Sequence, residues 1–232
     1  MKAIAPHEQL DAILPIFKPN CISSYEVIRK FKKESGFQGK VGHAGTLDPF
    51  ADGLLLVLLN KATKKFEEIQ KWQKVYWAKA IMGASSRTLD SEGEIKPQIN
   101  CPTPKLEKIE FEARSLVGGY EQKVPDYSAA KHHGIPLYKL AREGKAVPPK
   151  TKWVEIYHIS VTSYRFPELE FEADVGSGTY IRQLSYDWLK KMGVESYLVR
   201  LTRTSIGKIG LNQACKIDDF KNENWKKFIL EV

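Results

Sequence analysis

The chain has 232 residues, enough for one large domain or two small ones with a substantial core. Hydrophobic residues make up 42% of it and charged residues 28%, which is ordinary for a soluble globular protein. The net charge of +8 suits a polyanionic partner, although simple solubility explains it equally well.

The three cysteines, Cys21, Cys101 and Cys215, are widely spaced and form no CxxC motif. This pattern argues against a disulfide framework or a zinc knuckle and fits a reducing compartment. The first twenty residues lack the apolar core of a signal peptide, and the longest apolar run is far too short to span a membrane. We therefore expect a cytoplasmic protein that does not associate with membranes.

Three elements are predicted in the first part of the chain. "CISSYEVIRKFKKESG" predicts a helix, with a capping box formed by Ser23 and Glu26 and an end at Gly36. "LLLVLL" is either a buried strand or a turn of helix, because periodicity cannot decide for so short a run. "KVYWAKAIMG" predicts a strand on which Tyr76 shares a face with two alanines, which leaves room beside the phenol ring.

The second part alternates helices and strands. "TPKLEKIEFEARSLVGG" predicts a helix with Thr103 as N-cap and the glycine pair at its end. "WVEIYHISVTSYRF" and "ELEFEADV" predict two strands joined at Pro167, and "YIRQLSYDWLKKMG" predicts a helix closed by Gly193. Since no regular βαβ period connects these elements, we expect an α+β sheet protein. No repeat, linker or break in composition is present, so the sequence predicts a single domain over residues 1–232.

Asp48 lies on a glycine-rich turn, "GHAGTLDPFADG", directly before the apolar run. The simplest explanation is an aspartate that forms the turn or caps a helix. Its surroundings favour a functional role instead, because His43 lies five residues before it and no second acid follows until Asp52.

Arg182 follows a second glycine-rich segment, "DVGSGTYIRQL", in which a strand runs into a helix. Free backbone N–H groups at such a turn can form a generic anion site, and Arg182 could equally be a surface charge. The spacing does not match a P-loop. Arg182 is predicted at the edge of the buried stripe of its helix, beside Ile181 and Leu184.

The segment from Val124 to Lys150 mixes cations with aromatic rings, with prolines at both ends. Such a mixture is typical of a nucleic-acid surface, where cations meet phosphates and rings stack on bases. Part of the segment reads as a solvated amphipathic helix around Leu137, Leu140 and Ala141. The adjacent His132 and His133 have no third ligand at metal spacing nearby, so we expect no metal site.

Taken together, the motifs resemble the bacterial tRNA pseudouridine synthase B family, in order and over most of the chain. The matching stretches are "KPNCISS", "VGHAGTLDPFADGLL" with "NKATK", "KVYWAKAIMG" through "TLDSEGEI", "VPDYSAAKHHGIPLYKLAREG", "GTYIRQL" and "VRLTRTSIG". Each stretch is weak alone, whereas five or six in the right order are specific.

The departures from the family pattern remove no chemically essential group. Ala44 replaces a threonine, Phe50 and Asp52 replace a leucine and a threonine, and Cys21–Ile22 replaces Gly-Met. Family members commonly carry a small RNA-binding PUA domain after the catalytic domain. Thirteen residues follow "KIDD", so the resemblance predicts a catalytic domain alone.

The resemblance implies the pseudouridine synthase fold, a large mixed and mostly antiparallel sheet flanked by helices with an active-site cleft across it. The implied reaction isomerises a uridine of the tRNA T-arm loop, position 55 in tRNA numbering, to pseudouridine without a cofactor. Asp48 is then the nucleophile, attacking either C1′ of the sugar or C6 of the base. Arg182 keeps its carboxylate ionised and fixes its direction, and Tyr76 stacks on the uracil and is placed to take the C5 proton.

The remaining site residues are expected to bind the RNA. The uridine must be flipped out of its stacked loop, and His43 is the candidate to hold or replace it, or else a histidine that caps the turn. Tyr180 and Leu201 line the pocket, and Asp90 organises its loop or contacts RNA. Lys18 and Lys64 meet phosphates or brace the turn of Asp48. In the RNA-contacting insertion, residues 124–150, the expected contacts are Lys131 and Arg142.

Three alternatives remain open. A non-catalytic protein that binds or folds tRNA would share the basic face without needing Asp48 and Arg182. A glycoside or nucleoside hydrolase would use two cooperating carboxylates, for which Asp52 is a poor second. A guide-RNA-dependent relative would work inside a multiprotein particle, whereas we expect no obligate protein partner here.

Overall fold

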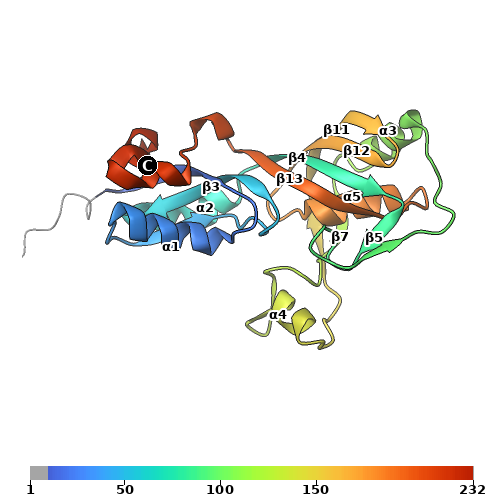
Figure 1. Ribbon diagram of the computed structural model, residues 1–232, viewed down its shortest axis with the longest axis horizontal. Helices are drawn as coiled ribbons and strands as arrows, with labels where there is room; N and C mark the ends of the chain where they lie inside the picture. Colours follow the sequence, from blue (N-terminus) through green and yellow to red (C-terminus); the bar gives the residue numbers. More distant parts are fainter. Residues whose placement is uncertain (1–9, 232) are drawn as a thin grey trace, which may run out of the picture. The chain divides into compact units, whose positions relative to one another are not determined.

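The computed structural model describes residues 10–231, which form two compact units (Figure 1). Unit 1 contains residues 10–76 and 201–231, and unit 2 contains residues 77–200. Residues 1–9 and residue 232 lie outside the described residues. The prediction that the chain has no signal peptide falls partly on residues 1–9. Over residues 10–231, no helix is both long and apolar enough to cross a membrane.

Unit 1 is built on strand β3 (Asp52–Leu59), which settles the open question about "LLLVLL" in favour of a strand. It pairs antiparallel with β1 (Ala12–Lys18) and with β2 (Val41–Ala44), and parallel with the end of β13 (Ser196–Ile206). Leu55, Val57 and Leu59 point into one buried cluster, and Leu54, Leu56 and Leu58 into another. A strand that is covered on both faces reads as an uninterrupted apolar run.

Short helices cover both faces of this part of the sheet. On one face lie α1 (Ser24–Ser35) and the 3-10 segment η4 (Ile217–Phe228), whose Trp225 packs edge-on against Phe31. On the other lie η2 (Asn60–Lys65), α2 (Phe66–Gln70) and η3 (Leu211–Gln213). The boundaries of α1 are as predicted: the Ser23 hydroxyl accepts from the Glu26 N–H at 3.1 Å, and Gly36 ends the helix with a φ of 69°.

Unit 2 contains the hydrogen-bonded strands β11 (Ile156–Arg165) and β12 (Glu168–Val175), with most of β4 (Lys74–Met82) and the first part of β13, up to Arg200. The predicted inward face of β12, Leu169 to Val175 at every second residue, is buried. Two helices pack on the sheet, α3 (Leu106–Arg114) and α5 (Ile181–Lys190). Trp188 of α5 stacks edge-on against Phe171, and its indole N–H donates to the Ile109 carbonyl at 2.9 Å.

Three sequence predictions for unit 2 are wrong in detail. Helix α3 ends at Arg114 with Ser115 as C-cap, before the glycine pair predicted to end it. The N-cap of α3 is Lys105 rather than Thr103, because the Pro104 carbonyl accepts the Tyr164 hydroxyl at 2.6 Å and the chain stays extended until residue 105. "WVEIYHISVTSYRF" forms two strands instead of one. Its first part, β10 (Thr151–Val154), pairs with β7 (Tyr120–Lys123), whereas β11 pairs with β12.

Smaller elements complete unit 2. β5 (Ala84–Ser86) pairs with β6 (Ile95–Pro97), and β8 (Lys131–His132) with β9 (Ile135–Pro136). Helix α4 (Leu137–Arg142) confirms a short amphipathic helix, since Leu137 and Ala141 are buried. The described strands form one mixed, mostly antiparallel sheet of nine strands and three small sheets, with helices packed on them. The predicted α+β class is therefore confirmed.

Candidate active site

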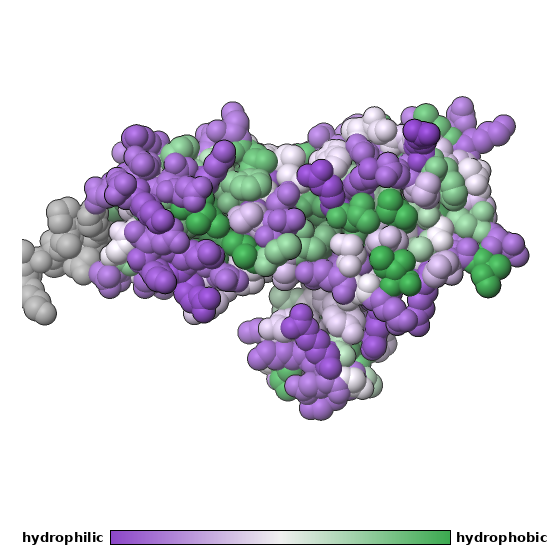
Figure 2. Space-filling view, in the orientation of Figure 1, coloured by the Kyte–Doolittle hydropathy of each residue, from purple (hydrophilic) through white to green (hydrophobic). Residues whose placement is uncertain are grey.

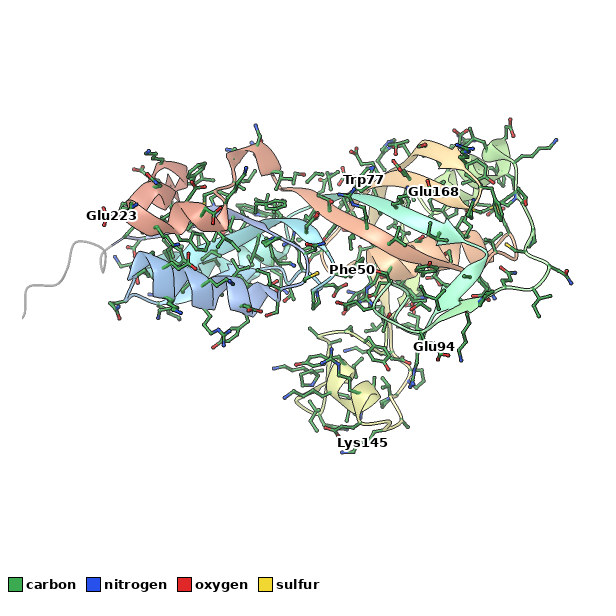
Figure 3. All side chains as sticks on the ribbon, viewed as in Figure 1. Phe50, Trp77, Glu94, Lys145, Glu168 and Glu223 are labelled. Atoms are coloured by element: carbon green, nitrogen blue, oxygen red, sulfur yellow. The ribbon has the colours of Figure 1, made fainter. Side chains whose placement is uncertain are left out.

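The turn that carries Asp48 joins β2 to β3 in unit 1 and is held on both sides of this residue. On one side, the Ser24 hydroxyl accepts from the Leu47 N–H at 2.9 Å and donates to the Leu47 carbonyl at 3.2 Å. On the other, the Cys21 N–H donates to the Pro49 carbonyl at 2.8 Å. Figure 3 labels Phe50, which belongs to the same turn. The backbone that presents Asp48 is thus fixed by the segment that leads into α1.

Lys18 also holds this turn and is fully buried. Its ammonium group donates to three backbone carbonyls, those of Pro19 at 2.9 Å, Ile22 at 2.8 Å and Pro49 at 3.3 Å. Burial lowers the pKa of Lys18 to about 8, against the opposing attraction of the Asp52 and Asp48 carboxylates. The side chain is therefore mostly charged at pH 7. These contacts are those of a lysine that braces the turn.

Arg203 is a central residue of unit 1 that the sequence analysis did not select. It is 1% exposed, and its Nε donates to the Leu54 carbonyl at 2.8 Å. Nη2 donates to the Gly45 carbonyl at 2.9 Å, and Nη1 to the Tyr76 hydroxyl at 3.4 Å. The available signal was its place in "VRLTRTSIG", a stretch that carried the family resemblance but to which no role was given.

His43 lies on β2 opposite Val57 and is partly buried. Burial is the main cause that lowers its pKa, and the positive charge of Arg203 lowers it further. The imidazole is therefore neutral at pH 7. Its buried Nδ1 has no hydrogen-bond partner among residues 10–231. A neutral ring of this kind can stack against a base or replace one.

The other predicted residues of unit 1 differ in exposure. Tyr76 is buried on the face of β4 predicted for it, in line with Ala78 and Ala80. Leu201 is buried on β13, two residues before Arg203. Lys64 is exposed in η2.

Arg182 belongs to unit 2 and is buried rather than at the edge of a stripe. Its Nη1 forms an ion pair with Asp90 at 3.3 Å and also donates to the Thr88 carbonyl, and its Nη2 donates to the Tyr127 carbonyl at 3.1 Å. Asp90 in turn accepts from the Thr88 hydroxyl at 2.5 Å and from the Glu92 N–H at 3.0 Å. The guanidinium is thus held by the loop of Asp90 and by the segment that begins the insertion.

Tyr180 caps α5 and is held through its backbone by the fully buried Gln122. The Gln122 side chain accepts from the Tyr180 N–H at 2.8 Å and donates to its carbonyl at 3.1 Å. It also donates to the Tyr120 hydroxyl, which donates to Asp187. Burial raises the pKa values of both Tyr120 and Asp187. This network fixes the start of the helix that carries Arg182, and no sequence motif indicated it.

The insertion, residues 124–150, starts from the paired ends of β7 and β10, and the Val124 N–H donates to the Lys150 carbonyl at 2.8 Å. Figure 2 shows mostly hydrophilic side chains on its visible face around α4. Lys131 and Arg142 are exposed, and the Arg142 guanidinium lies 5.7 Å from the centre of the Tyr138 ring. The rings of His132 and His133 lie 4.1 Å apart, and among residues 10–231 no group of three or more possible ligands could hold a metal ion.

The predicted site residues fall into both units. Unit 1 carries His43, Asp48 and Tyr76, together with Leu201, Lys18 and Lys64, whereas unit 2 carries Arg182, Tyr180 and Asp90 together with Lys131 and Arg142. The pairing of Asp48 with Arg182 concerns both units and stays a prediction.

Comparisons with known proteins agree with the motifs. Residues 29–181 match the family model of the TruB family pseudouridylate synthase N-terminal domain. The chain is 37% identical over 223 residues to tRNA pseudouridine synthase B of Clostridium acetobutylicum, which covers 96% of this chain and 76% of that protein. It is also 37% identical over 219 residues to the protein of the same name from Thermosipho melanesiensis, covering 94% and 71%.

Solved structures show the same fold at lower identity. A chain of a Cbf5–Nop10–Gar1 complex gives a TM-score of 0.71 at 23% identity, covering 97% of this chain and 61% of that chain. A chain of an H/ACA RNP bound to a substrate RNA containing 2′-deoxyuridine gives 0.70 at 22% identity, covering 97% and 60%. The chain thus spans about 60% of the length of these structural relatives. The matched family model and the curated relatives establish that this chain belongs to the TruB family of pseudouridylate synthases, which are isomerases, as its motifs predicted.

Proposed function

We propose that this chain is a tRNA pseudouridine synthase that isomerises the T-arm loop uridine at position 55. The proposal takes its substrate class from the curated relatives, which are named for tRNA. In this proposal, the two units belong to one catalytic domain, with the active-site cleft across its sheet. The enzyme works in the cytoplasm without a cofactor or an obligate protein partner.

The observation that carries the proposal is the fixed presentation of Asp48. Its two neighbours, Leu47 and Pro49, are bonded to the first residue of α1 and to the segment before that helix, respectively. The buried ammonium of Lys18 attracts the Asp48 carboxylate. A catalytic group must be held in the productive geometry while water is kept away. A turn that only reversed the chain would need neither a buried lysine nor a clamp on both sides.

Asp48 then acts as the nucleophile on a flipped-out uridine, at C1′ of the sugar or at C6 of the base. Arg182 is the proposed cationic partner of the Asp48 carboxylate. The orientation of its guanidinium is set by Asp90 and by two backbone carbonyls. Tyr76 stacks on the uracil and takes the proton from C5. That proton is balanced by the one that N1 gains when the base is reattached through C5, so the mass of the RNA does not change.

RNA binding is assigned to residues that present charge or a flat ring. Lys131 and Arg142 of the insertion are exposed and can meet phosphates of the T-arm. The neutral imidazole of His43 suits insertion into the RNA loop in place of the everted base. Tyr180 and Leu201 would line the uracil pocket, and exposed Lys64 would meet a phosphate.

The test is pseudouridine mapping on a T-arm stem-loop incubated with the purified chain. We expect Asp48→Asn to bind the RNA as the wild type does and to form no pseudouridine, because the amide cannot act as the nucleophile. Asp218→Asn, an exposed acid of η4 in the same unit, is the matched control and should keep full activity. Unchanged product with Asp48→Asn would defeat the nucleophile assignment.

The other outcomes separate the alternative functions. Wild-type protein that binds the stem-loop and forms no product would favour a non-catalytic tRNA-binding or folding protein. Release of free uracil would favour a hydrolase. Product that forms only after a guide RNA and partner proteins are added would favour the particle-dependent relatives.

A further inference from the structure

The buried guanidinium of Arg203 has an unusual set of partners. Each of its three nitrogens donates to an oxygen, and these belong to Leu54 on β3, Gly45 at the start of the Asp48 turn, and Tyr76 on β4. Among residues 10–231, the Tyr76 hydroxyl is the only ionisable group that it bonds. A buried arginine normally pairs with a carboxylate, because an uncompensated charge in the interior is costly.

The surroundings of Arg203 are also positive. Its charge contributes to lowering the pKa values of His43, Lys18 and Lys74, in each case after burial as the larger cause. The Arg203 Cζ lies 6.0 Å from the centre of the Tyr76 ring.

The hydrogen bond between Arg203 and Tyr76 also fixes the direction of the phenol O–H group. Because the phenol oxygen accepts from Arg203 Nη1, its own proton points elsewhere, and the same guanidinium anchors the Gly45 carbonyl three residues before Asp48. Gly53 lets the backbones of β3 and β13 approach closely here, since a Cβ at Gly53 would lie 2.4 Å from the Arg203 carbonyl oxygen. One side chain thereby sets Tyr76 and the Asp48 turn relative to each other.

We propose that Arg203 is a positioning residue for the isomerisation: it orients the Tyr76 hydroxyl so that the phenol oxygen can accept the C5 proton. This inference rests on the proposed function. In the step, the C5–H bond breaks, its electrons restore the C5–C6 double bond of the uracil, and the proton moves to the Tyr76 oxygen. As that proton arrives, the phenol's own proton passes to water, and N1 is protonated from water.

Arg203→Lys is the main test, because lysine keeps the charge and loses the fork of donors. With T-arm RNA that carries 5-deuterated uridine, we expect kcat to fall about 100-fold with KM unchanged. We also expect the deuterium isotope effect on kcat to rise above that of the wild type, since proton removal from C5 becomes slower than the other steps. Arg29→Lys, on the exposed face of α1, is the matched control and should change neither quantity.

The isotope effect separates positioning from a general structural role. A variant that only reduces the folded fraction lowers the rate and leaves the isotope effect unchanged, and that result would overturn the proposal. An inactive wild type would instead overturn the proposed function, so the two failures are distinguishable.

Tyr76→Phe keeps the proposal testable if Arg203→Lys does not fold. Loss of the hydroxyl leaves the buried guanidinium without one acceptor, so the urea midpoint of unfolding should fall below that of the wild type. Tyr25→Phe, on a ring that is 70% exposed, should leave the midpoint unchanged. An unchanged midpoint for Tyr76→Phe would contradict the contact on which the inference depends.

Discussion

A buried charge can hold a turn only while it keeps its proton, and Lys18 illustrates the condition. Its three acceptors are backbone carbonyls, so no carboxylate lies within ion-pair distance in residues 10–231 to keep it ionised. Four groups act on its charge: Asp52 and Asp48 favour it, as does Cys21, whereas Arg203 opposes it. Burial outweighs the favourable groups, and the pKa falls to about 8.

Lys18→Met should therefore differ from the wild type in a pH-dependent way. Between pH 8 and 10.5 the unfolded lysine still binds a proton that the folded one has lost, so the free energy of unfolding of the wild type rises with pH relative to the variant. From pH 7 to pH 10 the gain should be about 2.5 kcal/mol, measured by urea denaturation. Lys65→Met, an exposed residue nearby, should show a constant difference. A constant difference for Lys18→Met would mean that its pKa is not lowered.

At the scale of elements, the parallel pairing of β3 with β13 depends on Gly53. This residue has a φ of 110°, and a Cβ there would lie 2.4 Å and 2.6 Å from the carbonyl oxygen and the nitrogen of Arg203. Both atoms belong to the backbone, so neither can move aside as a flexible side chain would. Left-handed strain and steric overlap therefore act together at this position.

Gly53→Ala should lower the free energy of unfolding by about 3 kcal/mol or more. Gly36→Ala is the matched control, since Gly36 has a φ of 69° and a Cβ there would meet open space. Strain alone should cost about 1 kcal/mol at that position. Urea denaturation of both variants checks the difference, and equal costs would mean that the two strands do not approach as closely as described.

The insertion, residues 124–150, is expected to bind RNA phosphates through its exposed cations. Replacing Lys131, Lys139 and Arg142 by glutamine should weaken binding to a T-arm stem-loop and make its salt dependence shallower by about 2 in the slope of log K against log salt. The matched triple of exposed cations beside and on α3, Lys105, Lys108 and Arg114, should leave the slope unchanged. Equal slopes for the two triples would remove the insertion from the RNA-binding surface.

At the scale of the whole molecule, local signals were enough for many of the elements. The capping residue of α1, the glycine that ends this helix and the alternation along β12 each act over a few residues, and each was read correctly. The family motifs in the sequence are enough to identify Asp48 and Arg182 as candidates. What local patterns could not reveal depended on partners far away in the chain.

Two cases show this limit. Thr103 has the features of an N-cap, yet Tyr164 bonds the Pro104 carbonyl from 60 residues away and the helix starts later. Arg203 contacts Gly45, Leu54 and Tyr76 across 158, 149 and 127 residues, and two of those acceptors are backbone carbonyls that leave no trace in the sequence. Short motifs select side chains by type, whereas burial and long-range bonds decide what those side chains do.

The division of the chain also has a consequence for its synthesis. Unit 2 is one continuous stretch, whereas unit 1 needs both residues 10–76 and residues 201–231. A ribosome therefore completes unit 2 while β3 still lacks its parallel neighbour, β13, whose Arg203 is translated 149 residues after Leu54. Until then the start of β3, at Asp52 and Gly53, has an unpaired edge, which exposes the nascent chain to aggregation and to capture by chaperones.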